Sequence, residues 1–279
     1  MSSIIDVDQL KKWMEEKAEN MTIIDCRFDL SDPTWGEQEY KKGHIPGSIY
    51  AHLERDLSGK VGEHGGRHPL PDDQEFETFV QKCGITKNRI VVVYDQGGAA
   101  FSSRLWWMLK YAGIEHVFVL NGGYDSWIKA GNPISTVEPN ITPSSFQIEK
   151  NDRLIAQYHE VKEVVEKGKK DVILIDSREE KRYKGEFEPI DHKAGHIPGA
   201  VNYPWMEGLE EKQFAPIEKQ KRRFSSIEPN KEIIVYCGSG VTATPNVLLL
   251  NEAGFKNVKL YVGSFSDWIS YKENNIETN

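Results

Sequence analysis

Residues 232–250 read EIIVYCGSGVTATPNVLLL, and this stretch decides how the chain is interpreted. Its β-branched start predicts a buried strand, its glycines predict a short loop, and its apolar end predicts a helix with proline in the first turn. Cys237 therefore lies between a strand end and a helix N-terminus, where unpaired backbone N–H groups and the positive end of the helix dipole face it. A thiol in such a place is held partly as thiolate, so Cys237 is the predicted nucleophile.

The plan of this stretch occurs twice in the chain. Four motifs of the first half recur in the same order in the second half. In the first half they are IIDCR (23–27), GHIPG (43–47), IVVVYD (90–95) and GGYDSW (122–127). In the second half they are LIDSR (174–178), GHIPG (195–199), IIVYC (233–237) and GSFSDW (263–268). Short apolar strands alternate with helical patterns, which predicts parallel sheets covered by helices on both faces. We expect an α/β fold with two tandem domains, residues 1–135 and 151–279, joined by a linker at 136–150.

The two copies differ in ways that bear on function. Asp95 stands where Cys237 stands in the second copy, so the first copy has a glycine loop without a nucleophile and is predicted to be catalytically inactive. The first copy is also ten residues longer between its GHIPG motif and its tyrosine strand. That span contains GEHGGRHPLP (62–71), a loop with Arg67 and His68 that the second copy lacks.

Composition limits the classes of partner. The net charge is −8 with both signs mixed along the chain, which does not favour nucleic acid or anionic lipid, so an anionic substrate would need attraction from local amides and arginines. Three cysteines are too few and odd in number for a disulfide framework and fit a reducing cytoplasm. We expect no membrane span, no secretory signal at the N-terminus, no metal site and no cofactor.

Taken together, the two GHIPG motifs, the Trp106-Trp107 helix and the CGSGVTA loop resemble tandem rhodanese domains over nearly the whole chain. The resemblance implies two rhodanese-like domains, the first inactive and the second catalytic. It also implies a sulfurtransferase, in which Cys237 takes up a sulfane sulfur as a persulfide and passes it to a thiophilic acceptor. That acceptor is a thiol, cyanide or a thioredoxin-like protein, and the donor is a small anion.

The CGSGVTA loop looks like that of mercaptopyruvate sulfurtransferases, because Gly238 and Ser239 are neutral where thiosulfate-using enzymes carry basic residues. In the mercaptopyruvate enzymes the serine polarises the donor, helped by a histidine and an aspartate of the first domain. The motif matches the histidine to His44, and Asp32 is the aspartate nearest to the expected spacing, displaced from it by one residue. The amides of the remaining loop residues are expected to stabilise the persulfide; these are Gly238, Gly240, Val241 and Thr242.

The donor carboxylate is expected to be bound by Arg182, which matches the substrate arginine of the family. Such enzymes usually have a second arginine after a Glu-Pro pair, but here Ile190 follows Glu188-Pro189. The loop with Arg67 and His68 looks more like that of thiosulfate-using relatives, and Arg67 could replace the missing charge from across the domain cleft. A thiosulfate sulfurtransferase and a sulfur-carrier module that binds a protein partner therefore remain alternatives.

A cysteine phosphatase is a further alternative, since its nucleophile also lies in an amide-lined loop after a strand. Its loop needs an arginine six residues after the cysteine to bind phosphate. Ala243 occupies that position here, which argues against phosphate chemistry.

Overall fold

The computed structural model describes residues 2–278, which divide into two compact units. Unit 1 contains the chain as far as Gly59, together with Pro71–Asn151 and Glu211–Phe214. Unit 2 contains Lys60–Leu70, Asp152–Glu210 and the chain from Ala215 onward. The segment 60–70 was predicted within the first domain, and in the structure it packs as part of unit 2.

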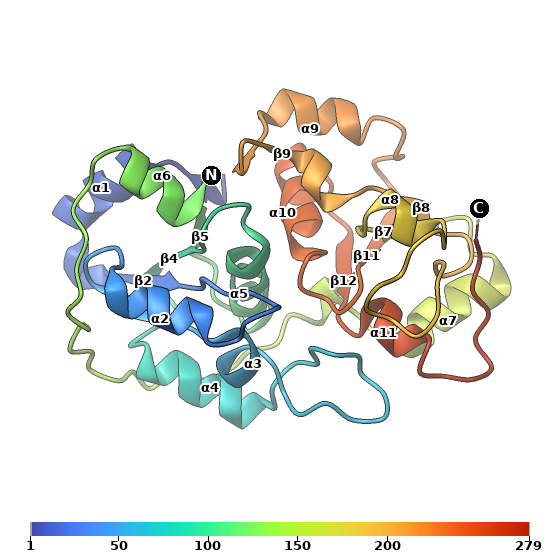
Figure 1. The fold of residues 1–279 in the computed structure, drawn as a ribbon, viewed down its shortest axis with the longest axis horizontal. Coiled ribbons are helices and arrows are strands. Elements are labelled where there is room, and N and C mark those ends of the chain that lie inside the picture. Colours follow the sequence, from blue (N-terminus) through green and yellow to red (C-terminus); the bar gives the residue numbers. More distant parts are fainter. Residues whose placement is uncertain (1, 279) are drawn as a thin grey trace. The chain divides into compact units, whose positions relative to one another are not determined.

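Unit 1 is built on a five-stranded parallel sheet with the order β1-β5-β4-β2-β3. Figure 1 labels β2, β4 and β5 of this sheet. Its strands are β1 (Ile4–Ile5), β2 (Met21–Asp25), β3 (Ser48–Tyr50), β4 (Ile90–Tyr94) and β5 (Val117–Leu120). Its helices are α1 (Val7–Glu16), η1 (Ala18–Asn20), α2 (Trp35–Lys42), α3 (Leu53–Asp56), α4 (Asp73–Lys82), α5 (Ala100–Tyr111) and α6 (Gly123–Lys129). The short strand β10 (Gln213–Phe214) also belongs to this unit.

Unit 2 repeats the plan with the order β6-β12-β11-β7-β8, again parallel. Its strands are β6 (Ile155–Ala156), β7 (Val172–Asp176), β8 (Val201–Asn202), β9 (Leu209–Glu210), β11 (Glu232–Tyr236) and β12 (Val258–Tyr261). Its helices are η2 (Asp152–Leu154), α7 (Tyr158–Lys167), α8 (Glu180–Tyr183), η3 (Trp205–Gly208), α9 (Ile217–Arg223), α10 (Thr244–Ala253) and α11 (Ser264–Trp268). The prediction of two α/β domains with helix-covered parallel sheets is confirmed.

Each sheet is buried because helices cover both of its faces. In unit 1 the core on one face includes Leu10 and Trp13 of α1 and Trp127 of α6, while α5 packs on β4 and β5. In unit 2 the corresponding core includes Val161 of α7 and Trp268 of α11, while α10 packs on β11 and β12. Strands buried on both sides read as continuous apolar runs, which explains the absence of polar alternation in the sequence.

The repeated motifs form the same hydrogen-bonded network at the carboxyl end of each sheet. Arg27 donates to Asp25 at 2.7 Å and to the carbonyl of Gly43 at 2.7 Å. Arg178 donates to Asp176 at 2.7 Å and to the carbonyl of Gly195 at 2.6 Å. The ID-x-R motif is therefore an ion pair that binds the strand end to the turn before His-Ile-Pro-Gly.

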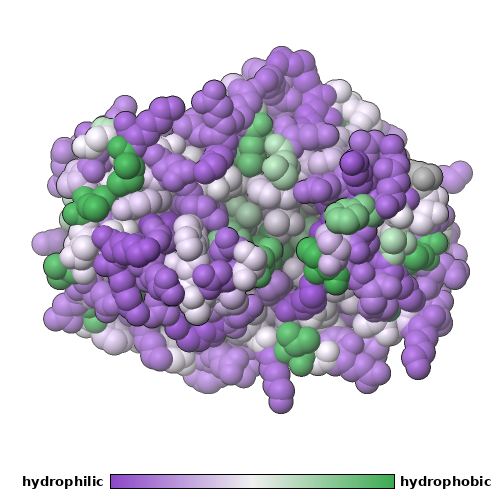
Figure 2. Space-filling view, viewed as in Figure 1, coloured by the Kyte–Doolittle hydropathy of each residue, from purple (hydrophilic) through white to green (hydrophobic). Residues whose placement is uncertain are grey.

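The face of the molecule in Figure 2 is mostly hydrophilic, with hydrophobic residues in small separate patches. This agrees with a chain in which charged residues make up 28%. Within residues 2–278, no helix has the length and apolar character needed to cross a membrane.

The ion pair of unit 1 gives a stability prediction. Replacing Arg27 by methionine leaves the Asp25 carboxylate buried without its cation, which costs about 3–5 kcal/mol. We expect Arg27→Met to lower the urea midpoint of unfolding, followed by far-ultraviolet circular dichroism. Arg55→Met, which removes a half-exposed arginine of the same unit, is the matched control and should cost about 1 kcal/mol or less. Equal losses for the two variants would contradict this account.

Candidate active site

Cys237 follows β11 directly and begins a loop that leads into α10. Its side chain is 1% exposed and forms no disulfide. Its N–H donates to Ser264 Oγ at 3.2 Å, and its carbonyl accepts from the N–H of Phe265 at 3.0 Å. Gly240 N–H donates to Cys237 Sγ at 3.1 Å. The Ser264 hydroxyl and the N–H groups of Phe265 and Gly240 therefore hold Cys237 in place after the end of β11.

The loop after Cys237 requires glycine because the backbone of a neighbouring segment approaches it closely. Gly240 has φ +76°, and a Cβ at this position would lie 2.2 Å from the carbonyl oxygen of Val262. A side chain here would push the loop away from β12 and move the Gly240 N–H from Sγ.

The segment 60–70 contacts the Cys237 loop through several specific interactions. His68 Nδ1 lies 2.8 Å from Ser239 Oγ, and Arg67 pairs with Asp191. The backbone N–H of Gly65 donates to Asp267 at 2.7 Å, and the ring of His64 stacks on Tyr271 with centroids 3.9 Å apart. The structure therefore brings both predicted residues of this loop, Arg67 and His68, to the nucleophile of unit 2.

Charged side chains connect the buried strand end to this loop. Arg178, already paired with Asp176, donates to Glu188 at 3.2 Å. Glu188 accepts three hydrogen bonds from Arg182, at 3.1, 2.9 and 2.7 Å. Arg182 also donates to Asp191 at 3.0 Å, and Asp191 pairs with Arg67. We call this set of alternating charges, from Asp176 to Arg67, the charge chain.

The two arginines at the end of the charge chain face the Cys237 loop. A Cβ at Gly238 would lie 2.9 Å from Arg67 Nη2 and 3.5 Å from Arg182 Nη2. Burial lowers the pKa of Arg67, while the neighbouring Cys237 thiolate acts in the opposite direction. Arg67 is therefore electrostatically coupled to Cys237, and the guanidinium groups of Arg182 and Arg67 both lie beside the Cys237 loop. We call the position between these two guanidinium groups and Gly238 the anion position.

Unit 1 shows what the same loop does without a cysteine. Both oxygens of the Asp95 carboxylate accept backbone N–H groups, from Gly97 and Ala99 on one side and from Phe101 and Ser102 on the other, at 2.9–3.2 Å. Burial raises the pKa of Asp95, and the hydrogen bonds from the loop oppose that rise. The loop amides converge on an anion, and in unit 1 the protein itself supplies it.

His44 and Asp32, which the resemblance matched to the partners of Ser239, have other contacts in the structure. His44 is wholly buried in unit 1, where its ring nitrogens lie 2.8 Å from the carbonyl of Tyr40 and 3.2 Å from that of Val137. Both nitrogens thus face backbone oxygens, as suits a structural turn. The exposed Asp32 accepts from the N–H and hydroxyl of Thr34 at the start of α2. Ser239 is not among these described contacts of His44 and Asp32, whereas His68 Nδ1 lies 2.8 Å from Ser239 Oγ.

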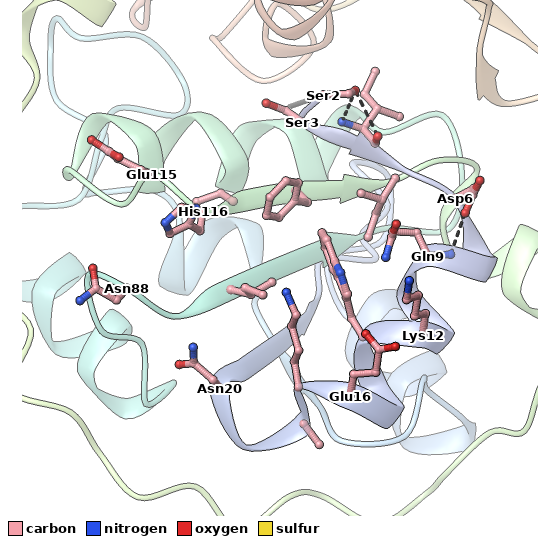
Figure 3. A pocket seen from close by; sticks show the side chains of 18 of the residues that line it. Ser2, Ser3, Asp6, Gln9, Lys12, Glu16, Asn20, Asn88, Glu115 and His116 are labelled. Atoms are coloured by element: carbon pink, nitrogen blue, oxygen red, sulfur yellow. Dashed lines mark hydrogen bonds between the residues drawn. The ribbon is translucent and has the colours of Figure 1, made fainter.

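Unit 1 contains a recess with charged side chains around it. The recess in Figure 3 has a volume of about 1460 Å³ and lies in unit 1, between α1 and the starts of β4 and β5. Acidic and basic side chains are mixed around it, including Asp6, Lys12, Glu16 and Glu115. No cysteine is among the residues that line it.

Several site residues were not singled out from the sequence. Glu188 and Asp191 hold the two arginines, and Ser264 accepts the N–H of Cys237. Ser264 lies in the repeated GSFSDW motif, which was the available signal for its role. For Asp191 the sequence offered a weaker signal, because its position three residues after Glu188 was the single feature that distinguished it.

Comparison with known proteins agrees with this geometry. The model of the rhodanese-like domain matches residues 6–130 and 157–271. This chain belongs to the rhodanese family. It is 38% identical to the probable 3-mercaptopyruvate sulfurtransferase of Pseudomonas aeruginosa, over 96% of this chain and 95% of that protein. It is 30% identical to the thiosulfate sulfurtransferase of Gallus gallus, over 92% of this chain and 91% of that one.

The fold is shared with solved structures as well. The 3-mercaptopyruvate sulfurtransferase SseA of Escherichia coli superposes with a TM-score of 0.84 at 29% identity, covering 95% of this chain and 100% of that one. The predicted family and the predicted enzyme class, a sulfurtransferase with rhodanese domains, are confirmed.

The loop of unit 1, whose amides bind the Asp95 carboxylate, gives a second prediction. Asp95→Asn places an amide donor against the backbone donors of the loop, so buried N–H groups lose their acceptor at a cost of about 2–3 kcal/mol. We expect a lower urea midpoint of unfolding than for the wild type. Asp125→Asn, an exposed carboxylate of the same unit, is the matched control and should leave the midpoint nearly unchanged. A wild-type midpoint for Asp95→Asn would show that the loop does not depend on this anion.

Proposed function

We propose that this sulfurtransferase moves sulfur from mercaptopyruvate to a thiophilic acceptor through a persulfide on Cys237. The observation that carries the proposal is the 2.8 Å contact between His68 Nδ1 and Ser239 Oγ, two residues from the nucleophile. A serine hydroxyl oriented by histidine suits a donor with a carbonyl group. Mercaptopyruvate has one, and thiosulfate does not.

In the first step the Cys237 thiolate attacks the donor sulfur. The new S–S bond forms as the carbon–sulfur bond breaks, and the electron pair passes into the pyruvate enolate. With His68 N–H donating to Ser239 Oγ, the serine hydroxyl is free to donate to the enolate oxygen, where negative charge develops. The enolate then takes up a proton at carbon to give pyruvate.

In the second step an acceptor thiolate or cyanide attacks the outer sulfur, and Cys237 leaves as thiolate. Between the steps the outer sulfur carries negative charge. In unit 1 the equivalent loop directs its amides at the carboxylate of Asp95, which supports an equivalent role for the amides of Gly238 through Thr242 around the persulfide.

The donor carboxylate is assigned to the anion position formed by Arg182 and Arg67. Arginine has the planar fork that binds a carboxylate through two N–H groups. Ile190 is exposed and apolar, so it supplies no charge, and Arg67 from the segment 60–70 takes the place of the second arginine.

Thiosulfate is the second candidate donor. The two basic residues beside Gly238 favour an anion of either kind, and relatives of this chain are named for both donors. For the acceptor we propose a small thiol, cyanide or a thioredoxin-like protein. The three free cysteines support a reducing compartment such as the cytoplasm.

A comparison of the two donors tests the proposed function. Wild-type protein should transfer sulfur to cyanide with a higher kcat/KM from mercaptopyruvate than from thiosulfate, and Cys237→Ser should abolish both reactions. Ser239→Ala should lower kcat with mercaptopyruvate by about 100-fold, the usual loss for one oxyanion donor, and affect thiosulfate less. Ser225→Ala, an exposed serine of unit 2, is the control. A preference for thiosulfate that Ser239→Ala leaves intact would contradict the choice of donor.

The anion position is tested separately. Arg182→Ala and Arg67→Ala each remove a charged hydrogen-bond donor, worth about 1.5–3 kcal/mol, so KM for mercaptopyruvate should rise by about 10- to 100-fold. Arg222→Ala removes an exposed arginine of α9 and should leave KM unchanged. If Arg67→Ala matched Arg222→Ala, the segment 60–70 would not take part in donor binding.

A further inference from the structure

We infer that Asp191 sets the donor preference of this enzyme, by reducing the positive charge that Arg67 and Arg182 present to the donor. The inference rests on the proposed function and assigns a role to a residue that contacts the two arginines rather than the donor. It makes Asp191 a positioning residue that favours a donor with one negative charge over one with two.

Asp191 is placed where it affects both arginines at once. Its carboxylate is 2% exposed, accepts from Arg182 through one oxygen and pairs with Arg67 through the other. Its backbone is fixed as well, because Glu188 Oε1 accepts the N–H groups of Ile190 and Asp191 at 3.0 and 3.1 Å. The carboxylate is therefore a built part of the anion position.

The formal charges within the charge chain sum to zero. Three guanidinium groups, of Arg67, Arg178 and Arg182, alternate with the carboxylates of Asp176, Glu188 and Asp191. Asp176 and Glu188 are held on the side of the core by Arg178, which is itself buried. Asp191 is the carboxylate of this set that pairs with both of the arginines that face Gly238, so its charge acts on both of them.

The charge of the donor then decides how strongly Asp191 acts. Coulomb repulsion is proportional to the charge on each partner, so a carboxylate near the anion position repels a dianion about twice as strongly as a monoanion. Mercaptopyruvate carries one carboxylate, whereas thiosulfate is a dianion. Partial burial of the site keeps salt from screening this difference fully.

Kinetics with both donors test the inference. Asp191→Asn keeps the shape of the side chain and removes its charge, so the ratio of kcat/KM for thiosulfate to that for mercaptopyruvate should rise by at least about tenfold, mainly through a lower KM for thiosulfate. Asp191→Glu keeps the charge and should retain the wild-type ratio. Glu186→Gln is the matched control, because it removes an exposed carboxylate from the same segment and changes the net charge equally.

The outcomes separate the alternatives. If Asp191 only supports the fold of the site, Asp191→Asn lowers kcat/KM for both donors alike and the ratio stays constant, which overturns the inference. A shift of equal size in Glu186→Gln also overturns it, since the effect would then come from overall charge. The shift should shrink as ionic strength rises.

A binding measurement keeps the inference distinct from the proposed function. Sulfate and pyruvate, a dianion and a monoanion, can be compared for their protection of Cys237 against alkylation by iodoacetamide. Asp191→Asn should strengthen protection by sulfate about tenfold relative to pyruvate, whichever donor the enzyme turns over. Unchanged relative protection overturns the inference even if mercaptopyruvate is the donor. If Asp191→Asn shifts the protection as expected but wild-type protein does not turn over mercaptopyruvate, only the proposed function is contradicted.

Discussion

The buried ion pair between Asp176 and Arg178 is the constraint on which the rest of unit 2 depends. An ionised carboxylate at a strand end is costly to bury unless a cation and further hydrogen bonds satisfy it, and Arg178 does so while also donating to Gly195 and Glu188. Through Glu188 and Asp191 the same alternation of charge reaches Arg182 and Arg67 beside the nucleophile. The position of the donor arginines is thus inherited from the packing of the sheet, which keeps them rigid without any contact to a donor.

The duplication places one scaffold around two different residues, Asp95 in unit 1 and Cys237 in unit 2. Both units hold an arginine against a strand-end aspartate, and in both this arginine lies over an aromatic ring, Tyr124 in unit 1 and Phe265 in unit 2. Both also direct a glycine loop at the residue that follows the tyrosine strand. In unit 1 that residue is a carboxylate, which satisfies the loop amides permanently. In unit 2 it is the thiol of Cys237, and in the proposed mechanism the corresponding amides stabilise the persulfide anion that forms on it.

The site of unit 2 is completed by a segment that the chain supplies from its first half. Residues 60–70 bring a histidine to Ser239 and an arginine to Asp191, and they are fixed to unit 2 through Gly65 and Asp267. These contacts explain why the ten extra residues occur in the first copy alone. They also give the site the second cation that Ile190 does not provide. In the proposed function the donor is bound by groups from three separate stretches of chain, around Arg67, Arg182 and Cys237.

The sequence by itself determined the fold, the duplication and the family, and it predicted the nucleophile, because these follow from local patterns. Apolar strands, glycine loops and repeated motifs can be recognised without knowing which distant residues they contact. Cys237 can be recognised because the first copy has Asp95 at the equivalent position. The partner of Ser239 was decided only by the tertiary structure. His44 lies in a motif that occurs twice, and such repetition indicates a structural turn. His68 lies in a loop, and no local pattern predicts which part of the protein that loop contacts. Asp191 likewise acquires its role from the two arginines that converge on it, and convergence of side chains distant in sequence is a property of the folded chain.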